Sequence, residues 1–124
     1  MPRSIRESLE SQPLSGLVLM VSDSLTLLNR RRVFEYAAER RLPAIYETDS
    51  LTREGGLMSY GPDRREIFER SAALVDRIFK GTKPADLPVE QPTHFLFVLN
   101  LKTAKTMRLD VPNTLHGLAD EVIE

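Results

Sequence analysis

With 124 residues, the chain has room for one hydrophobic core, which excludes a protein built from two lobes of ordinary size. Its 17 Lys and Arg residues against 18 Asp and Glu residues give a formal net charge of -1, so no overall charge bias points to nucleic acid or to an anionic membrane. The sequence contains no cysteine, which excludes a disulfide framework and a thiolate metal site.

The N-terminal residues Met1 to Glu7 have no apolar run after their basic side chains. No stretch of the chain approaches the roughly 18 consecutive apolar residues that a membrane span needs. We therefore expect the chain as written to be soluble and cytoplasmic, without an export signal. A short helix is expected from Arg3 to Gln12, because the residue before Pro13 avoids the helical region.

The first strand is predicted at Leu17 to Val21, a continuous apolar run of the kind found in a parallel strand that is covered on both faces. Polar residues that can cap a helix follow at 22–24. A helix is then expected from Leu25 to Arg41, and a second strand from Pro43 to Tyr46. Strand, helix and strand in this order favour a right-handed parallel crossover.

A polar segment from Glu47 to Gly56 leads to a third predicted strand at Leu57 to Tyr60. The clearest helix of the sequence follows, from Asp63 to Lys80, and Gly81 suits its C-terminal cap. Its apolar stripe predicts that this helix lies on a sheet. The stripe consists of Ile67, Leu74, Val75, Ile78 and Phe79.

The segment 83–92 holds three prolines and no apolar periodicity, so it is expected to be an extended connector. A fourth strand is predicted at Phe95 to Leu99, and two short helices at Thr103 to Arg108 and Leu115 to Ile123. These elements together predict a single α/β domain over residues 1–124, with a small, mostly parallel sheet flanked by helices.

Ligands of open α/β sheets bind beyond the carboxyl ends of the strands, where helix N-termini also point. Asp23 or Glu47 could pair with an ammonium group there, serine hydroxyls could hold a carboxylate, and Tyr60 could stack on a ring. Such a set suits an amino acid or another small polar solute. The candidate ligand-binding residues are Ser22, Asp23, Ser24, Glu47 and Tyr60. Asn100 is expected to cap the helix that follows it.

Sharper chemical motifs are absent from the sequence. Ser59 lacks the Gly-x-Ser-x-Gly spacing of a hydrolase nucleophile. His94 and His116 have neither metal-binding spacing nor cysteine companions. The basic turn at 30–32 lies within a helix that is apolar on its other side, without the interleaved aromatics that nucleic-acid binding would need. We therefore expect no enzyme, no metal, no cofactor and no nucleic-acid partner.

Three blocks of sequence carry a family resemblance: GGLMSYGPD at 55–63, KGTKPADLPVEQP at 80–92 and NLKTAK at 100–105. In this order, with one amphipathic helix between the first two, they resemble the C-terminal part of ABC-transporter substrate-binding proteins. The resemblance extends from about Leu14 to Glu124. It implies a type I periplasmic-binding-protein fold, of which this chain would be the second lobe plus a crossover helix, and some members of the group bind aromatic amino acids.

The resemblance implies that the chain is part of a two-lobed protein that captures a solute and delivers it to a membrane permease, in the periplasm and without chemistry. The sheet partner of the helix from Asp63 to Lys80 would then belong to the other lobe. Since its stripe still needs burial, we expect a homodimer with this helix at the interface. The alternative is a truncated domain that serves only as an oligomerising or interaction module and binds no ligand.

Overall fold

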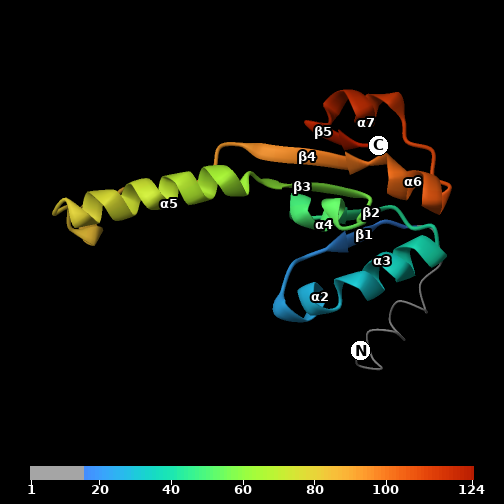
Figure 1. Cartoon of the computed structure of the whole chain (residues 1–124), viewed down its shortest axis with the longest axis horizontal. Helices are drawn as coiled ribbons and strands as arrows, with labels where there is room; N and C mark the ends of the chain where they lie inside the picture. The colour runs from blue at the N-terminus through green and yellow to red at the C-terminus, as the bar shows by residue number, and fades with distance from the viewer. Residues whose placement is uncertain (1–15) are drawn as a thin grey trace.

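The computed structural model describes residues 16–124, and the helix expected from Arg3 to Gln12 lies outside this range. A five-stranded sheet runs through the described chain in the order β1-β2-β3-β4-β5 (Figure 1). Neighbouring strands are parallel except for β3 and β4, which are antiparallel, so the predicted α/β fold with a mostly parallel sheet is confirmed. The strands are β1 (Val18–Met20), β2 (Ala44–Tyr46), β3 (Met58–Pro62), β4 (Phe95–Asn100) and β5 (Glu121–Ile123).

Helices connect the strands largely where the sequence predicts them. The helix expected from Leu25 to Arg41 forms but is interrupted at Asn29, which ends one segment and begins the next. Between residues 16 and 124 the α-helices are α2 (Ser24–Leu28), α3 (Arg30–Glu39), α4 (Asp49–Arg53), α5 (Arg64–Phe79), α6 (Leu101–Met107) and α7 (Asn113–Leu118). A 3-10 turn, η1 (Pro84–Asp86), lies in the connector 83–92.

Two elements differ from the prediction. The segment expected to be a loop between β2 and β3 contains α4, a helix too short to show an apolar period. The helix expected from Leu115 to Ile123 ends at Leu118, and residues 121–123 instead form β5 beside β4. Asp120 fixes this pairing, because its carboxylate accepts the N–H of Phe97 at 2.7 Å while its own N–H donates to the Phe97 carbonyl at 2.8 Å.

The core lies between the sheet and the helices α3, α4 and α6. At its centre Tyr46 is 1% exposed and meets Phe34 of α3 edge to face, with ring centroids 5.3 Å apart. This burial raises the pKa of the Tyr46 hydroxyl to about 12. The other buried residues of this cluster are Met20, Ala37, Ala44, Leu51, Leu57, Ala104 and Met107, and Val98 and Leu99 of β4 are buried as well.

The first strand is not covered on both faces as predicted. Met20 points into the core, but the alternate residues Leu17, Leu19 and Val21 are 59 to 65% exposed. The reason is that α3 packs only on the face of the sheet that carries Met20 and Tyr46. The continuous apolar run correctly predicts a strand but not its uncovered face.

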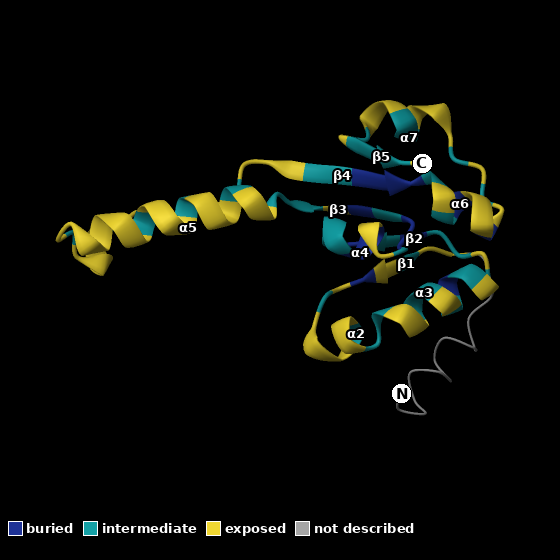
Figure 2. Cartoon of the chain, in the orientation of Figure 1, coloured by how far each residue is buried: buried dark blue, intermediate teal, exposed yellow. Residues whose placement is uncertain are grey.

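Helix α5 does not lie on a sheet of this chain, which corrects the prediction from its apolar stripe. Figure 2 shows it projecting beyond the sheet, and none of its residues is buried. The connector returns along one side of the helix, where Arg70 contacts Glu90 and the Thr93 hydroxyl. The opposite, apolar side is not packed on the sheet formed by residues 16–124.

Asn100 ends β4 and caps α6, as the sequence predicts. Its side-chain Oδ1 accepts the N–H of Thr103 at 3.0 Å, and its Nδ2 donates to the Thr52 carbonyl of α4 at 3.0 Å. The residue is only 4% exposed, so water replaces neither bond easily. Asn100 therefore joins the end of β4 to helices on both sides of it in sequence.

We expect Asn100→Ala to lower the free energy of unfolding by about 1 to 2 kcal/mol, since it removes a helix cap and one of the two hydrogen bonds that the Thr52 carbonyl accepts. Urea denaturation measures this change. Lys102→Ala, at an exposed position of the same helix, is the control and should stay within about 0.5 kcal/mol of the wild type. An equally small effect of Asn100→Ala would contradict the structural role.

Glu66 ties the base of α5 to β4 and generates a pH prediction. The Thr93 hydroxyl donates to its carboxylate at 2.6 Å and the His94 N–H at 2.9 Å, and these bonds lower the pKa of Glu66 from 4.5 to about 2. A depressed carboxyl pKa stabilises the fold above about pH 4.5, and this stabilisation is lost as the pH falls toward about 2.

The melting temperature of Glu66→Gln should accordingly lie below that of the wild type at neutral pH, and the gap should close as the pH falls from 4.5 toward 2. Glu69→Gln is the control, because it removes only an exposed ion pair with Arg65. Thermal unfolding followed by circular dichroism at several pH values checks both. If the difference in melting temperature between Glu66→Gln and the wild type did not change with pH, the contribution of Glu66 to stability would not depend on its negative charge.

Candidate functional site

The strands β1 and β2 are parallel, so their carboxyl ends lie side by side at the same end of the sheet, and polar residues follow each strand. Glu47 follows β2, and its carboxylate oxygen Oε2 accepts the backbone N–H of Ser22, which lies beyond β1, at 2.9 Å. The Ser22 hydroxyl is buried and has no hydrogen-bond partner within the described chain. These two predicted site residues are thus brought together.

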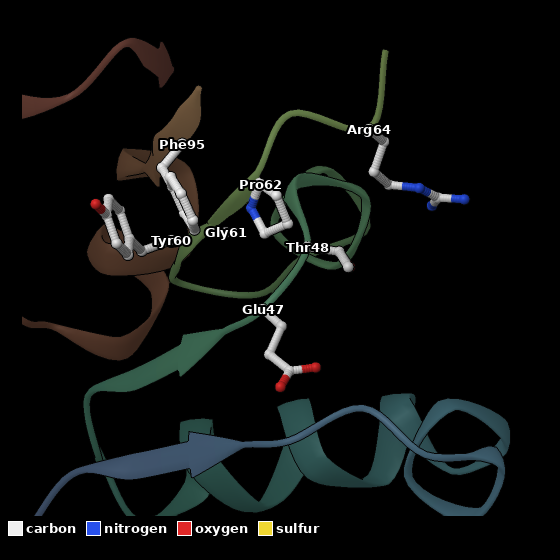
Figure 3. A pocket seen from close by; sticks show the side chains of 7 residues that line it. All are labelled: Glu47, Thr48, Tyr60, Gly61, Pro62, Arg64 and Phe95. Carbon is white, nitrogen blue, oxygen red and sulfur yellow. The ribbon is translucent and has the colours of Figure 1, made fainter. Parts of the chain in front are cut away.

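A hollow of about 400 Å³ opens beside Glu47, at the end of β2 and along the second half of β3 (Figure 3). Two of the five predicted site residues, Glu47 and Tyr60, line it. The complete lining consists of Glu47, Thr48, Tyr60, Gly61, Pro62, Arg64 and Phe95. Three predicted residues do not line the hollow: Ser22, Asp23 and Ser24. Ser22 is nevertheless connected to it, because its backbone N–H donates to the Glu47 carboxylate.

An aromatic pair forms one side of the hollow. The rings of Tyr60 and Phe95 are stacked, with centroids 5.7 Å apart and planes inclined by 22°. The antiparallel register of β3 and β4 brings them together, because Pro62 is opposite Phe95 and Tyr60 is two residues away on the same face. The side chains are 57% and 45% exposed, which leaves ring surface available for a flat apolar group.

The hollow also carries one acidic and one basic side chain. In Figure 3 the Glu47 carboxylate points toward the chain that follows β1, and Arg64 extends from the start of α5. Neither forms an ion pair with the described residues, and Arg64 lies over the ring of Phe68 at 5.9 Å. A solute with an ammonium group, a carboxylate and an apolar body matches these charges and rings.

Sequence reasoning missed Arg64 and Phe95. Arg64 is the first residue of an amphipathic helix, where an exposed charge is common and carries no signal of its own. Phe95 is part of an apolar strand, and only the register of β4 against β3 shows that it faces Tyr60. Neither position could be found without the pairing of these strands.

Asp23 is engaged in a helix cap. Its carboxylate accepts the N–H of Thr26 at 2.7 Å, and the Thr26 hydroxyl accepts the N–H of Asp23 at 2.9 Å, so the two form a capping box at the start of α2. The bond from the Thr26 N–H lowers the pKa of the exposed Asp23 carboxyl. Ser24 is the first residue of α2 and is exposed.

The structure holds no arrangement that indicates catalysis or metal binding in residues 16–124. The Ser59 hydroxyl is buried and forms no hydrogen bond there, so no base activates it. No group of three or more metal-ligating side chains occurs in this range. Likewise, none of the helices between residues 16 and 124 is long and apolar enough to cross a membrane.

Gly61 shapes the hollow by allowing β3 to approach the chain after β2. A Cβ atom at this position would lie 1.8 Å from the carbonyl oxygen of Glu47, so no other residue fits without moving the backbone. The close approach places Glu47 beside Tyr60 and Pro62. The geometry of the hollow therefore depends on a glycine that contributes no side chain.

Comparison with known proteins connects this arrangement to one family. A family model for the ABC transporter substrate binding protein matches residues 14–123. No curated protein sequence matches the chain.

Several solved structures are similar in fold. They include a conserved domain protein from Vibrio cholerae (20% identity, TM-score 0.79), the ABC domain in complex with L-Trp from Streptococcus pneumonia (22%, 0.75) and the ligand-free, open structure of a substrate binding protein with adhesive properties from Clostridium difficile (17%, 0.66). The similarity covers 87%, 86% and 99% of this chain but only 36%, 37% and 41% of those chains.

The role of Gly61 generates a prediction for the site. Gly61→Ala should lower the free energy of unfolding by about 1 to 3 kcal/mol, because the new methyl group overlaps the Glu47 carbonyl. Gly117→Ala is the matched control: a Cβ there meets nothing within 4 Å, and alanine in α7 should stabilise the helix by about 0.5 to 1 kcal/mol. Denaturant unfolding measures the stability of the two variants. Equal changes in the free energy of unfolding would mean that the close approach of Gly61 to the Glu47 carbonyl does not exclude a side chain at position 61.

Proposed function

The chain belongs to the family of ABC transporter substrate-binding proteins, and from this premise we propose that it forms one side of a binding site for a small polar or aromatic solute such as an amino acid. The family consists of binding proteins and not of enzymes, so the proposed function requires neither a catalytic residue nor a cofactor. The observation that carries the proposal is the hollow that combines Glu47, Arg64 and the Tyr60–Phe95 ring pair.

Each group has a proposed role in holding the solute. Glu47 pairs with an ammonium group, Arg64 with a carboxylate, and Tyr60 stacks on an apolar or aromatic body. L-Trp, which is present in one of the similar structures, combines these three features and is the first ligand to test. Ser22, Asp23 and Ser24 lie at the neighbouring strand end, and Ser22 acts through its hydrogen bond to Glu47.

The hollow is one-sided, which limits its affinity. The chain spans about two fifths of the similar structures, and we propose that the opposite wall of the site belongs to a part of the protein beyond these residues. A ligand in a complete site has about 70 to 90% of its surface buried. If a complete site binds at about 1 μM, or roughly -8 kcal/mol, loss of half of that energy leaves a dissociation constant near 1 mM.

The partners follow from the family. We propose that the solute is delivered to an ABC permease and that the complete protein works in the periplasm. In that protein the sheet of the other lobe would cover the apolar side of α5. Residues 1–124 would then form one α/β domain, with 83–92 as the connector that returns from α5 to β4.

Calorimetry with L-Trp and a panel of amino acids tests the site. We expect a dissociation constant near 1 mM for the chain, and a further loss of about tenfold or more in Glu47→Gln, because a charged contact to the ammonium group is removed. Asp23→Ala is the matched control: it should lower stability by about 1 kcal/mol through the lost cap and leave affinity unchanged.

Two outcomes would contradict the proposal. A submicromolar constant for the monomer would refute the one-sided site, because this chain would then supply a complete one. Full affinity in Glu47→Gln together with reduced affinity in Asp23→Ala would place the site at the start of α2 and not in the hollow.

A second candidate function is favoured by one observation, the exposed apolar side of α5. We propose as the alternative that the chain serves as a self-associating interaction module and binds no solute. Self-association without a calorimetric signal for any solute distinguishes this function from the first.

A further inference from the structure

The pairing of β3 with β4 is incomplete at the end nearest α5. Their antiparallel register continues to Asp63 and His94, whose places in it are those of a pair that exchanges two backbone hydrogen bonds. The Asp63 N–H does donate to the His94 carbonyl, at 2.9 Å. The Asp63 carbonyl, however, accepts the N–H of Ile67 in the first turn of α5, at 3.2 Å. The His94 N–H therefore needs another acceptor.

Glu66 supplies this acceptor from the first turn of α5. Its Oε2 accepts the His94 N–H at 2.9 Å, and its Oε1 accepts the Thr93 hydroxyl at 2.6 Å. The Arg70 guanidinium lies 2.8 Å from the same Oε1. Because the Glu66 side chain is only 16% exposed, water competes weakly for these bonds, and hydrogen bonds to a charged group are the stronger kind. A helix side chain thus replaces the strand pairing that the start of α5 interrupts.

The two segments that Glu66 joins carry two walls of the hollow. Arg64 is in the same first turn of α5, two residues before Glu66, and Phe95 directly follows His94. Arg64 and Phe95 line the hollow, whereas Glu66 does not. The position of the Arg64 backbone relative to Phe95 is therefore set by the hydrogen bonds of a residue outside the hollow.

We propose that Glu66 is a positioning residue of the solute site, which keeps Arg64 and Phe95 in place for a solute that contacts both. This inference rests on the function proposed above. Glu66 acts without touching the solute. Its contribution is preorganisation: walls that are already held in place lose less conformational freedom when a solute binds, and this loss is part of the cost of binding.

The contacts that remain without Glu66 are few. The Asp63 N–H still donates to the His94 carbonyl, and the Arg70 guanidinium still contacts the connector. The ring of Phe95 is 45% exposed and stacks on a ring that is itself 57% exposed, so packing alone does not fix it. None of these residues belongs to the buried core cluster. Removal of Glu66 should accordingly loosen the hollow and leave the core folded.

Binding of L-Trp to the wild type and to Glu66→Ala, followed by nuclear magnetic resonance titration, tests the proposal at the millimolar affinity expected for this chain. We expect Glu66→Ala to weaken binding about fivefold or more. Glu66→Gln should recover part of this loss, because its amide oxygen still accepts the His94 N–H. Tryptamine, which has the ring and the ammonium group but no carboxylate for Arg64, should lose less affinity than L-Trp in Glu66→Ala.

Asn100→Ala is the control for an effect of lowered stability. It weakens the fold at the opposite end of β4, away from the hollow, and should leave L-Trp affinity unchanged. Both Glu66 variants should keep the circular dichroism spectrum of the wild type. Equal losses of L-Trp affinity in Glu66→Ala and Asn100→Ala would overturn the positioning role, since lowered stability would then explain both.

A measurement on the solute-free protein separates this proposal from the proposed function. Nuclear Overhauser contacts between the rings of Tyr60 and Phe95 should be present in the wild type and in Asn100→Ala, and lost or weakened in Glu66→Ala. Unchanged ring contacts in Glu66→Ala would overturn the role of Glu66. If the wild type bound no solute while the ring contacts changed as expected, the proposed function would fail and the positioning of the walls by Glu66 would stand.

Discussion

The arrangement of the molecule depends on the double pairing of β3. On one side β3 runs parallel to β2, and on the other it runs antiparallel to β4. It can follow β2 closely past the end of that strand because Gly61 leaves room for the Glu47 carbonyl. The same strand places Tyr60 beside β4, and α5 begins just after its last residue and projects past the end of the sheet. The hollow and the projecting helix are therefore two results of one strand placement.

The sequence could predict the elements whose signal is local. Apolar runs predicted β1 to β4, and the 3.6-residue period predicted α3 and α5, because each pattern reflects the burial of a face that repeats along the chain. The short elements could not be predicted in this way. α4 has five residues and β5 has three, so neither completes a repeat, and β5 exists because Asp120 pairs with Phe97 far away in the sequence.

An apolar pattern predicts that a face is buried, but it does not say which other element or which other chain packs against that face. Leu19 and Val75 belong to patterns that predict burial, yet both are largely exposed here. Each such side chain left in water forgoes roughly 1.5 to 3 kcal/mol. The site shows the same limit: Glu47 and Tyr60 could be found as polar or aromatic residues at strand ends, whereas Phe95 joins them only through the strand register.

The two kinds of uncovered surface differ in what they require. The hollow is lined by a carboxylate, a guanidinium and two aromatic rings, and water solvates the charged groups well, so it is stable when empty. The apolar side of α5 has no polar groups that water could satisfy, and α5 is held to the connector by the partly exposed ion pair of Arg70 with Glu90 and by the hydrogen bonds of Glu66. Exposed ion pairs contribute little energy. The position of α5 is therefore set more by what covers its stripe than by its own chain, which makes this helix the part of the fold most sensitive to a partner.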